Sequence, residues 1–148
     1  MQVSVLCSSK RRAGRAGSSR SVLSTTSWLL GVALTVVMGL IHLRLWLDGY
    51  RQIPGIGPLF MVNAVFSGTL AAMLLAAPAR LRRAVALITA LFTAGTLAGL
   101  VLSLTIGLFA MHEILQAPLV VPTLIVEPAG VLALLVTAAL SDRTPRAQ

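Results

Sequence analysis

The sequence is poor in charged residues and in aromatic residues, and it has almost no cysteine. Charged residues make up 11% of the chain, whereas soluble domains carry about 25%. Acidic residues are the rarest, with 4 Asp+Glu against 12 Lys+Arg. The single cysteine, Cys7, excludes an intramolecular disulfide and a Cys-x-x-Cys redox pair. These shortages exclude an ordinary soluble enzyme and a disulfide-stapled domain.

Apolar residues dominate instead, at 57% of the chain, and the mean hydropathy is +0.91. Such hydrophobicity also excludes a chain that is disordered throughout. The apolar residues fall into four stretches at about 26–47, 59–77, 84–111 and 119–140. Each stretch is close to the roughly twenty residues that cross about 30 Å of hydrocarbon as a helix. We therefore predict an all-α fold, a four-helix transmembrane bundle made of two helix hairpins.

Polar segments border this region on both sides. Residues 1–24 are rich in Ser, Gly and Arg, which predicts a disordered basic cytoplasmic tail. Residues 25–141 form the predicted transmembrane domain, and residues 142–148 form a second cytoplasmic tail. The first apolar stretch is longer than the apolar region of a signal peptide, so we expect it to stay as an uncleaved helix.

The positions of Lys and Arg predict the orientation of the bundle. Five basic residues precede the first stretch, three lie within 78–83 and two follow the last stretch. The opposite side has only Arg51, with Arg44 near the end of the first stretch. By the positive-inside rule both termini are cytoplasmic, and the connections 48–58 and 112–118 face outward. We therefore expect a multi-pass protein of the cell membrane whose basic groups contact lipid headgroups and not nucleic acid.

Small residues spaced by four predict how the helices associate. In lipid, helices are held together by close backbone approach and not by apolar burial. The stretch 84–111 has two adjacent stripes of small residues, so we expect it to be the most buried helix. The stripes of the second and third stretches are Ala64, Gly68, Ala72, Ala76; Ala86, Ala90, Ala94, Ala98; and Gly95, Gly99, Ser103, Gly107.

Several polar side chains fall within or beside the outer halves of the apolar stretches. Ionisable groups at membrane depth are costly and usually face protein or a wet cavity. We predict that these residues line one ligand-binding pocket near the outer leaflet: His42, Arg44, Asn63, His112, Glu113 and Glu127. Arg44 has two other interpretations, because its long side chain could extend to the headgroups or pair with Glu113 or Glu127.

Glu127 gives the strongest single signal. The next residue, Pro128, removes one helical hydrogen bond and leaves the carbonyl of Leu124 without its partner. A carboxyl group beside an opened helical turn is typical of a ligand site or a proton site. The alternative is a protonated Glu127 that hydrogen-bonds to Asn63 or His42 and only joins helices.

Metal and cofactor sites are weaker hypotheses. His42 and His112 lie at similar depth, as bis-histidine ligation of haem requires, and with Glu113 and Glu127 they could in principle bind zinc. The spacing of these residues matches no metal motif, so we expect no metal, no resident cofactor and no catalytic residues. Haem or quinone is the less favoured alternative.

The run from His42 to Val65, HLRLWLDGYRQIPGIGPLFMVNAV, resembles a small family of bacterial four-helix integral membrane proteins. This resemblance covers residues 30–140 and implies the same fold without a known activity. The pattern Glu127-x-x-Gly130 is more distantly similar to the DoxX-like membrane proteins, some of which associate with quinone oxidation or thiol stress. The chain differs from them in having Asn63 at an acidic position and in lacking paired cysteines.

From these observations we expect a membrane component that is not an enzyme. It would be either an accessory subunit of a membrane-protein partner or a binder of a small ligand. A membrane redox protein that handles quinone or haem is one alternative. A small proton-coupled transporter that works as a homo-oligomer is the other.

Overall fold

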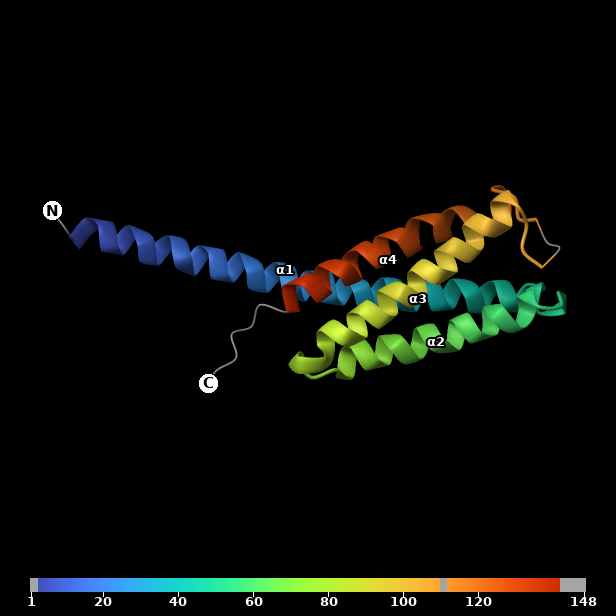
Figure 1. The fold of residues 1–148 in the computed structure, drawn as a ribbon, viewed down its shortest axis with the longest axis horizontal. Coiled ribbons are helices and arrows are strands. Elements are labelled where there is room, and N and C mark those ends of the chain that lie inside the picture. Colours follow the sequence, from blue (N-terminus) through green and yellow to red (C-terminus); the bar gives the residue numbers. More distant parts are fainter. Residues whose placement is uncertain (1–2, 110–111, 142–148) are drawn as a thin grey trace.

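The structure, a computed structural model, describes residues 3–109 and 112–141, with side chains from Ser19 onward. In this part of the chain the fold is all-α and has no β-sheet. Its long helices are α1 (Val3–Leu47), α2 (Ile56–Ala76), α3 (Ala79–Thr105) and α4 (Val120–Ser141), and a short 3-10 helix, η1, covers Tyr50–Gln52. The predicted four-helix bundle is confirmed (Figure 1). The predicted tail 142–148 lies outside the described residues.

The helices form two antiparallel hairpins that meet along α1 and α4. Helix α2 packs on α1, and α3 packs on α4, whereas α2 and α3 touch each other only sparsely. The start of α1 and the end of α4 lie toward the same end of the bundle, here called the terminal end (Figure 1). The connections 48–55 and 106–119 lie at the opposite end, here called the loop end. Antiparallel packing of the four helices therefore brings the start of α1 and the end of α4 to the same end of the bundle.

Helix α1 is longer than the sequence indicates. It begins at Val3 and runs through most of the segment 1–24 that is predicted to be disordered, of which residues 1–2 lie outside the described part. Its membrane-length apolar segment is Ser19–Leu47. Once the apolar segment is helical, extending the helix toward the N-terminus requires no new nucleation step. The Ala, Ser, Lys and Arg residues of the preceding segment are compatible with a helix.

The helix ends follow local backbone chemistry. Helix α3 ends at Thr105 and not at residue 111, because the chain turns at Gly107, where φ is 85°. A Cβ atom at Gly107 would come within 2.7 Å of His112 Nε2. The turn therefore needs glycine both for its positive φ and for the close contact with His112. Pro58 lies inside the first turn of α2, where the missing N–H removes no helical bond.

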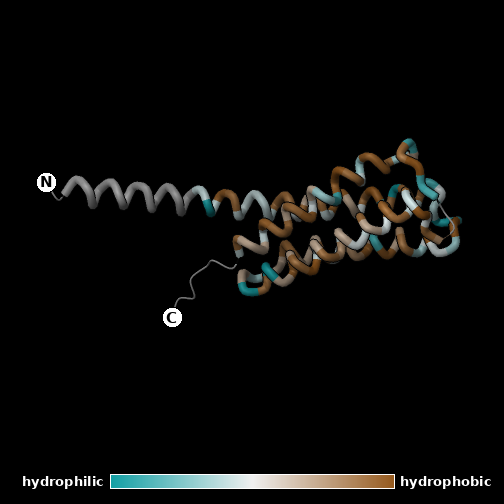
Figure 2. Tube along the Cα trace, turned by 45° about the horizontal axis from the view of Figure 1, so that its top comes forward, coloured by the Kyte–Doolittle hydropathy of each residue, from teal (hydrophilic) through white to brown (hydrophobic). Residues whose placement is uncertain are grey.

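The outer surface of the bundle is apolar, and its interior includes hydroxyl groups. Large apolar side chains such as Leu91 (76% exposed) and Leu132 (65%) face outward, while hydroxyl groups of Thr35, Thr89 and Thr137 are buried. Each of these buried hydroxyls donates to the carbonyl four residues earlier in its own helix. Figure 2 shows hydrophobic residues along the four helices and hydrophilic residues gathered toward the ends. All four helices are long and apolar enough to span a bilayer, so the chain is a multi-pass membrane protein.

Helix α1, and not α3, is the most buried, and this part of the prediction is wrong. Buried residues make up 44% of the most apolar window of α1 but 28% of that of α3. Close contact occurs at Gly39, where an added Cβ would lie 2.8 Å from Ser67 Cβ. At Gly68, Gly95 and Gly99 an added Cβ would meet nothing within 4 Å. Glycine thus permits close contact in α1 but borders open space in α2 and α3, whereas Ala86 and Ala90 of the α3 stripe are buried in the core.

Candidate functional site

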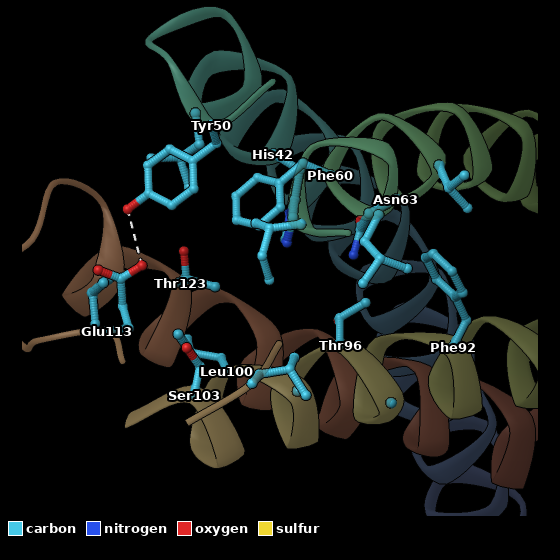
Figure 3. Close-up of a pocket in the computed structure, with 18 of the residues that line it drawn as sticks. His42, Tyr50, Phe60, Asn63, Phe92, Thr96, Leu100, Ser103, Glu113 and Thr123 are labelled. Atoms are coloured by element: carbon cyan, nitrogen blue, oxygen red, sulfur yellow. Dashed lines mark hydrogen bonds between the residues drawn. The ribbon is translucent and has the colours of Figure 1, made fainter. Parts of the chain in front are cut away.

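A cavity of about 400 Å³ lies between α2 and α3 toward the loop end. The short turn at Ala77–Pro78 holds these two helices together at the terminal end. Toward the loop end, α3 packs on α4 and diverges from α2. Residues of α1 and α4, including Leu45 and Val120, also contribute to the lining. Figure 3 shows the side chains of these elements converging on the space between α2 and α3.

Two glycines make the room for this cavity, and apolar side chains form its walls. Gly95 and Gly99 line it from α3, one turn apart, and neither has a neighbouring side chain where a Cβ would be. Leu91 and Val62 also line it, yet they are 76% and 48% exposed on the outer face of the bundle. Because exposed lipid-facing residues form part of its edge, the cavity opens sideways between α2 and α3.

Two polar side chains present complementary hydrogen-bonding groups to the cavity. His42 Nδ1 lies 2.9 Å from the carbonyl of Met38, which can only accept, so Nδ1 carries the hydrogen and Nε2 of the neutral ring is an acceptor. Asn63 is buried, and its Oδ1 accepts from the Ser67 hydroxyl at 3.1 Å. Its amide nitrogen points into the cavity as a donor (Figure 3). His42 and Asn63 thus offer one acceptor and one donor within a lining that is mostly apolar.

An aromatic stack and one hydrogen bond close the loop end of the cavity. Tyr50 stacks on Phe60 with 4.9 Å between ring centroids, and the His42 ring lies 5.2 Å from Phe60 on a tilted plane. The Tyr50 hydroxyl donates to Glu113 Oε2 at 2.9 Å (Figure 3). The N–H of Glu113 in turn donates to the carbonyl of Ser103 at the end of α3. This chain of contacts ties the two hairpins together above the cavity.

Tyr50 is the only tyrosine in the chain, so phenolate absorbance reports on it alone. Burial, then the hydrogen bond and negative charge of Glu113, raise the pKa of Tyr50 from 10.0 to about 12. We expect the absorbance titration to have its midpoint near pH 12. Because the folded-state pKa is the higher one, the stability that this group contributes is complete below pH 10 and is lost between pH 10 and about 12.

The matched variant for this titration is Glu113→Gln. It removes the charge and weakens the acceptor but leaves the burial, so the midpoint should fall part of the way toward pH 10. Equal midpoints in the variant and the wild type would show that Glu113 does not bond to Tyr50.

Glu127 does not line the cavity but lies next to Thr96, which does. Glu127 is 1% exposed, and within the described part of the chain neither carboxyl oxygen has a hydrogen-bond partner. Its polar neighbour is Thr96 of α3, whose side chain does line the cavity. Thr123, one turn earlier on α4, also lines it. Neither His42 nor Asn63 bonds to this carboxyl, so the structure lacks the helix-joining contact that the sequence offers as an alternative.

The predicted pocket residues therefore divide into three groups. His42, Asn63 and Glu113 line the cavity, and Glu127 lies next to it. Arg44 is exposed and pairs through Nε with Asp48 Oδ2 at 2.9 Å, one turn along α1. His112 is exposed and packs on Gly107, away from the cavity.

This division bears on the metal and haem hypotheses. The two histidines do not share a cavity. Among residues 3–109 and 112–141, no three His, Cys, Asp or Glu side chains gather closely enough to hold a metal ion. The structure therefore does not assemble the ligand set that the sequence offers for zinc.

Sequence reasoning missed the residues that shape the cavity. From the sequence, Gly95 and Gly99 are interpreted as positions of helix packing, and Phe60 and Phe92 are not identified as cavity residues. Their signal in the sequence is a pair of glycines one helical turn apart with an aromatic residue one turn before them (Phe92, Gly95, Gly99).

Comparison of the chain with protein-family models, with curated proteins and with solved structures finds no match. The function must therefore be argued from the cavity itself.

Proposed function

We propose that this chain binds a small, largely apolar molecule that reaches the cavity from within the bilayer. The observation that carries the proposal is a cavity of about 400 Å³ with an edge of lipid-facing residues and few polar groups. Ligand sites of this size are mostly apolar and use a small number of placed polar groups to orient the ligand. Here His42 and Asn63 supply those groups, one accepting and one donating.

The proposal includes an orientation in the cell membrane with both termini in the cytoplasm. The terminal end carries Arg20, Arg80, Arg82 and Arg83, whereas the loop end has two acids and two arginines, of which Arg44 is paired with Asp48. By the positive-inside rule this asymmetry supports a terminal end inside and a cavity in the outer leaflet.

Reporter fusions test this orientation. Green fluorescent protein joined after Gln148 should fluoresce, and alkaline phosphatase joined at the same point should be inactive. Fusions truncated within the connection 112–118 should give the reverse pattern. Active phosphatase at the C-terminus would overturn the orientation and move the cavity to the inner leaflet.

The binding proposal is tested by photolabelling. The protein, in nanodiscs of neutral lipid, is titrated with a neutral adamantane diazirine, and the labelled positions are mapped by mass spectrometry. We expect saturable labelling of Leu59–Asn63 and Leu91–Ser103. Ile125 and Leu132 of α4 are exposed but lie outside the cavity, so their labelling should rise linearly with probe. Linear labelling at all positions would reject a binding site.

A further inference from the structure

Two acidic residues lie at or next to the cavity. Glu113 lies at the closed end of the cavity and Glu127 lies next to the cavity, while no Lys or Arg lines it in the described part of the chain. The two arginines nearest the loop end are engaged elsewhere, Arg44 with Asp48 and Arg51 over the Trp46 ring at 5.8 Å. An anionic ligand would therefore find no opposite charge in the cavity and two carboxyl groups close by.

The hydrogen-bonding capacity of the Glu127 carboxyl group is not used within the described part of the chain. Both of its oxygens are buried without a hydrogen-bond partner in the described part of the chain. An unpaired polar group in a low-dielectric interior is costly, and an unpaired charge costs far more. Thr96, the polar neighbour of this carboxyl, lines the cavity, and so does Thr123, which lies four residues or about 6 Å away along α4. A cationic group in the cavity would thus lie close to the one orphaned acid of the membrane interior described here.

The walls suit the body of a lipophilic cation. Phe60 is held in place between the rings of His42 and Tyr50, and Phe92 lines the cavity from α3 while stacking on Phe66 at 5.9 Å. Aromatic faces attract cations through the ring quadrupole, and this attraction strengthens when water is excluded. The cavity combines such faces with two acids.

We propose that the cavity selects lipophilic organic cations, molecules with an apolar aromatic or aliphatic body and one ammonium-type or phosphonium-type charge. Glu127 ionises when the cation is bound and supplies the main opposing charge from next to the cavity, and Glu113 supplies a second one at the loop end. This inference rests on the proposed binding function and names the ligand class of the same site.

A pair of ions of nearly identical shape tests it. Tetraphenylphosphonium and tetraphenylborate differ mainly in the sign of their charge. Each is used to displace the saturable photolabel from wild-type protein in neutral nanodiscs, with partition into protein-free nanodiscs subtracted. We expect the cation to displace the label at a concentration at least tenfold lower than the anion. Equal displacement, or stronger displacement by the anion, would overturn the inference.

Charge-neutralising variants locate the effect. Glu127→Gln should weaken displacement by tetraphenylphosphonium about tenfold or more, and Glu113→Gln should weaken it less. Asp48→Asn is the matched control, since Asp48 is an acid of the loop end that does not line the cavity. Unchanged displacement in Glu127→Gln would overturn the role of Glu127. If that variant does not fold, the Glu113→Gln result and the comparison of the two ions on wild-type protein still test whether the cavity selects cations.

The outcomes separate the two proposals. If the neutral photolabel shows no saturable sites, the binding function itself fails and the ligand class fails with it. If the label saturates but both ions displace it equally, the binding function stands and only the selection of cations is lost.

Discussion

Replacing both Gly95 and Gly99 by leucine is expected to abolish saturable photolabelling of the cavity. Both glycines line the cavity of about 400 Å³, and an added Cβ at either would meet no atom within 4 Å. Two leucine side chains would therefore grow into the cavity without forcing α3 away from α4. The protein should stay folded and lose its site. The measurement is the labelling titration described above, with the mapped peptides compared between variant and wild type.

Gly68→Leu provides the control. Gly68 lies on an exposed face of α2, an added Cβ there also meets nothing within 4 Å, and the residue does not line the cavity. This variant should label as the wild type does, which separates cavity filling from the general effect of leucine for glycine in a helix. Wild-type labelling in the Gly95→Leu/Gly99→Leu protein would mean that the ligand sits elsewhere.

Gly39→Leu should have the largest effect on assembly of the bundle. A Cβ at this position would lie 2.8 Å from Ser67 Cβ and 3.4 Å from the carbonyl oxygen of Ala64, both fixed parts of α2. The helices would have to separate, and in lipid the lost close packing has no hydrophobic replacement. We expect Gly39→Leu not to assemble, and Gly39→Ala to lose about 1–3 kcal/mol of unfolding free energy. Unfolding in mixed micelles of increasing SDS content shows whether Gly39→Leu is folded at all and measures the unfolding free energy of Gly39→Ala.

Gly31→Ala is the informative comparison. Its added Cβ would lie 2.9 Å from Leu134 Cδ2, the far end of a flexible side chain and not a fixed Cβ atom. The loss of stability should therefore be clearly smaller than for Gly39→Ala. Equal losses at both positions would show that the α1–α2 contact at Gly39 can relax and is not the tight point of the bundle.

The fold follows from the sequence because the bilayer fixes the length and polarity of each span. Hydropathy alone locates four helices, and only their ends shift, where a backbone turn such as that at Gly107 decides. The approximate level of a polar residue along its span follows in the same way, and His42 and Asn63 do line one cavity.

The direction of a side chain around its helix is much harder to infer. Arg44 follows His42 by only two residues, yet two residues rotate the helix by about 200°. His42 consequently faces the cavity while Arg44 is exposed and pairs with Asp48. Direction depends on which neighbouring helix lies opposite, and a single sequence with apolar residues on every face does not show this.

The meaning of a small residue is ambiguous for the same reason. Gly39 and Gly99 look alike in the sequence, each on a stripe of small residues spaced by four. Gly39 faces α2 at contact distance, whereas Gly99 faces the space that α2 leaves open. Whether glycine permits contact or creates volume is settled by the path of the facing helix, which here diverges.

The sideways opening between α2 and α3 changes which concentration controls occupancy. A molecule that reaches the site through the leaflet never needs to be dissolved in water at an appreciable level. Its relevant measure is its mole fraction among the lipids, and diluting the sample with buffer would leave occupancy nearly constant. Diluting it with extra lipid would empty the site.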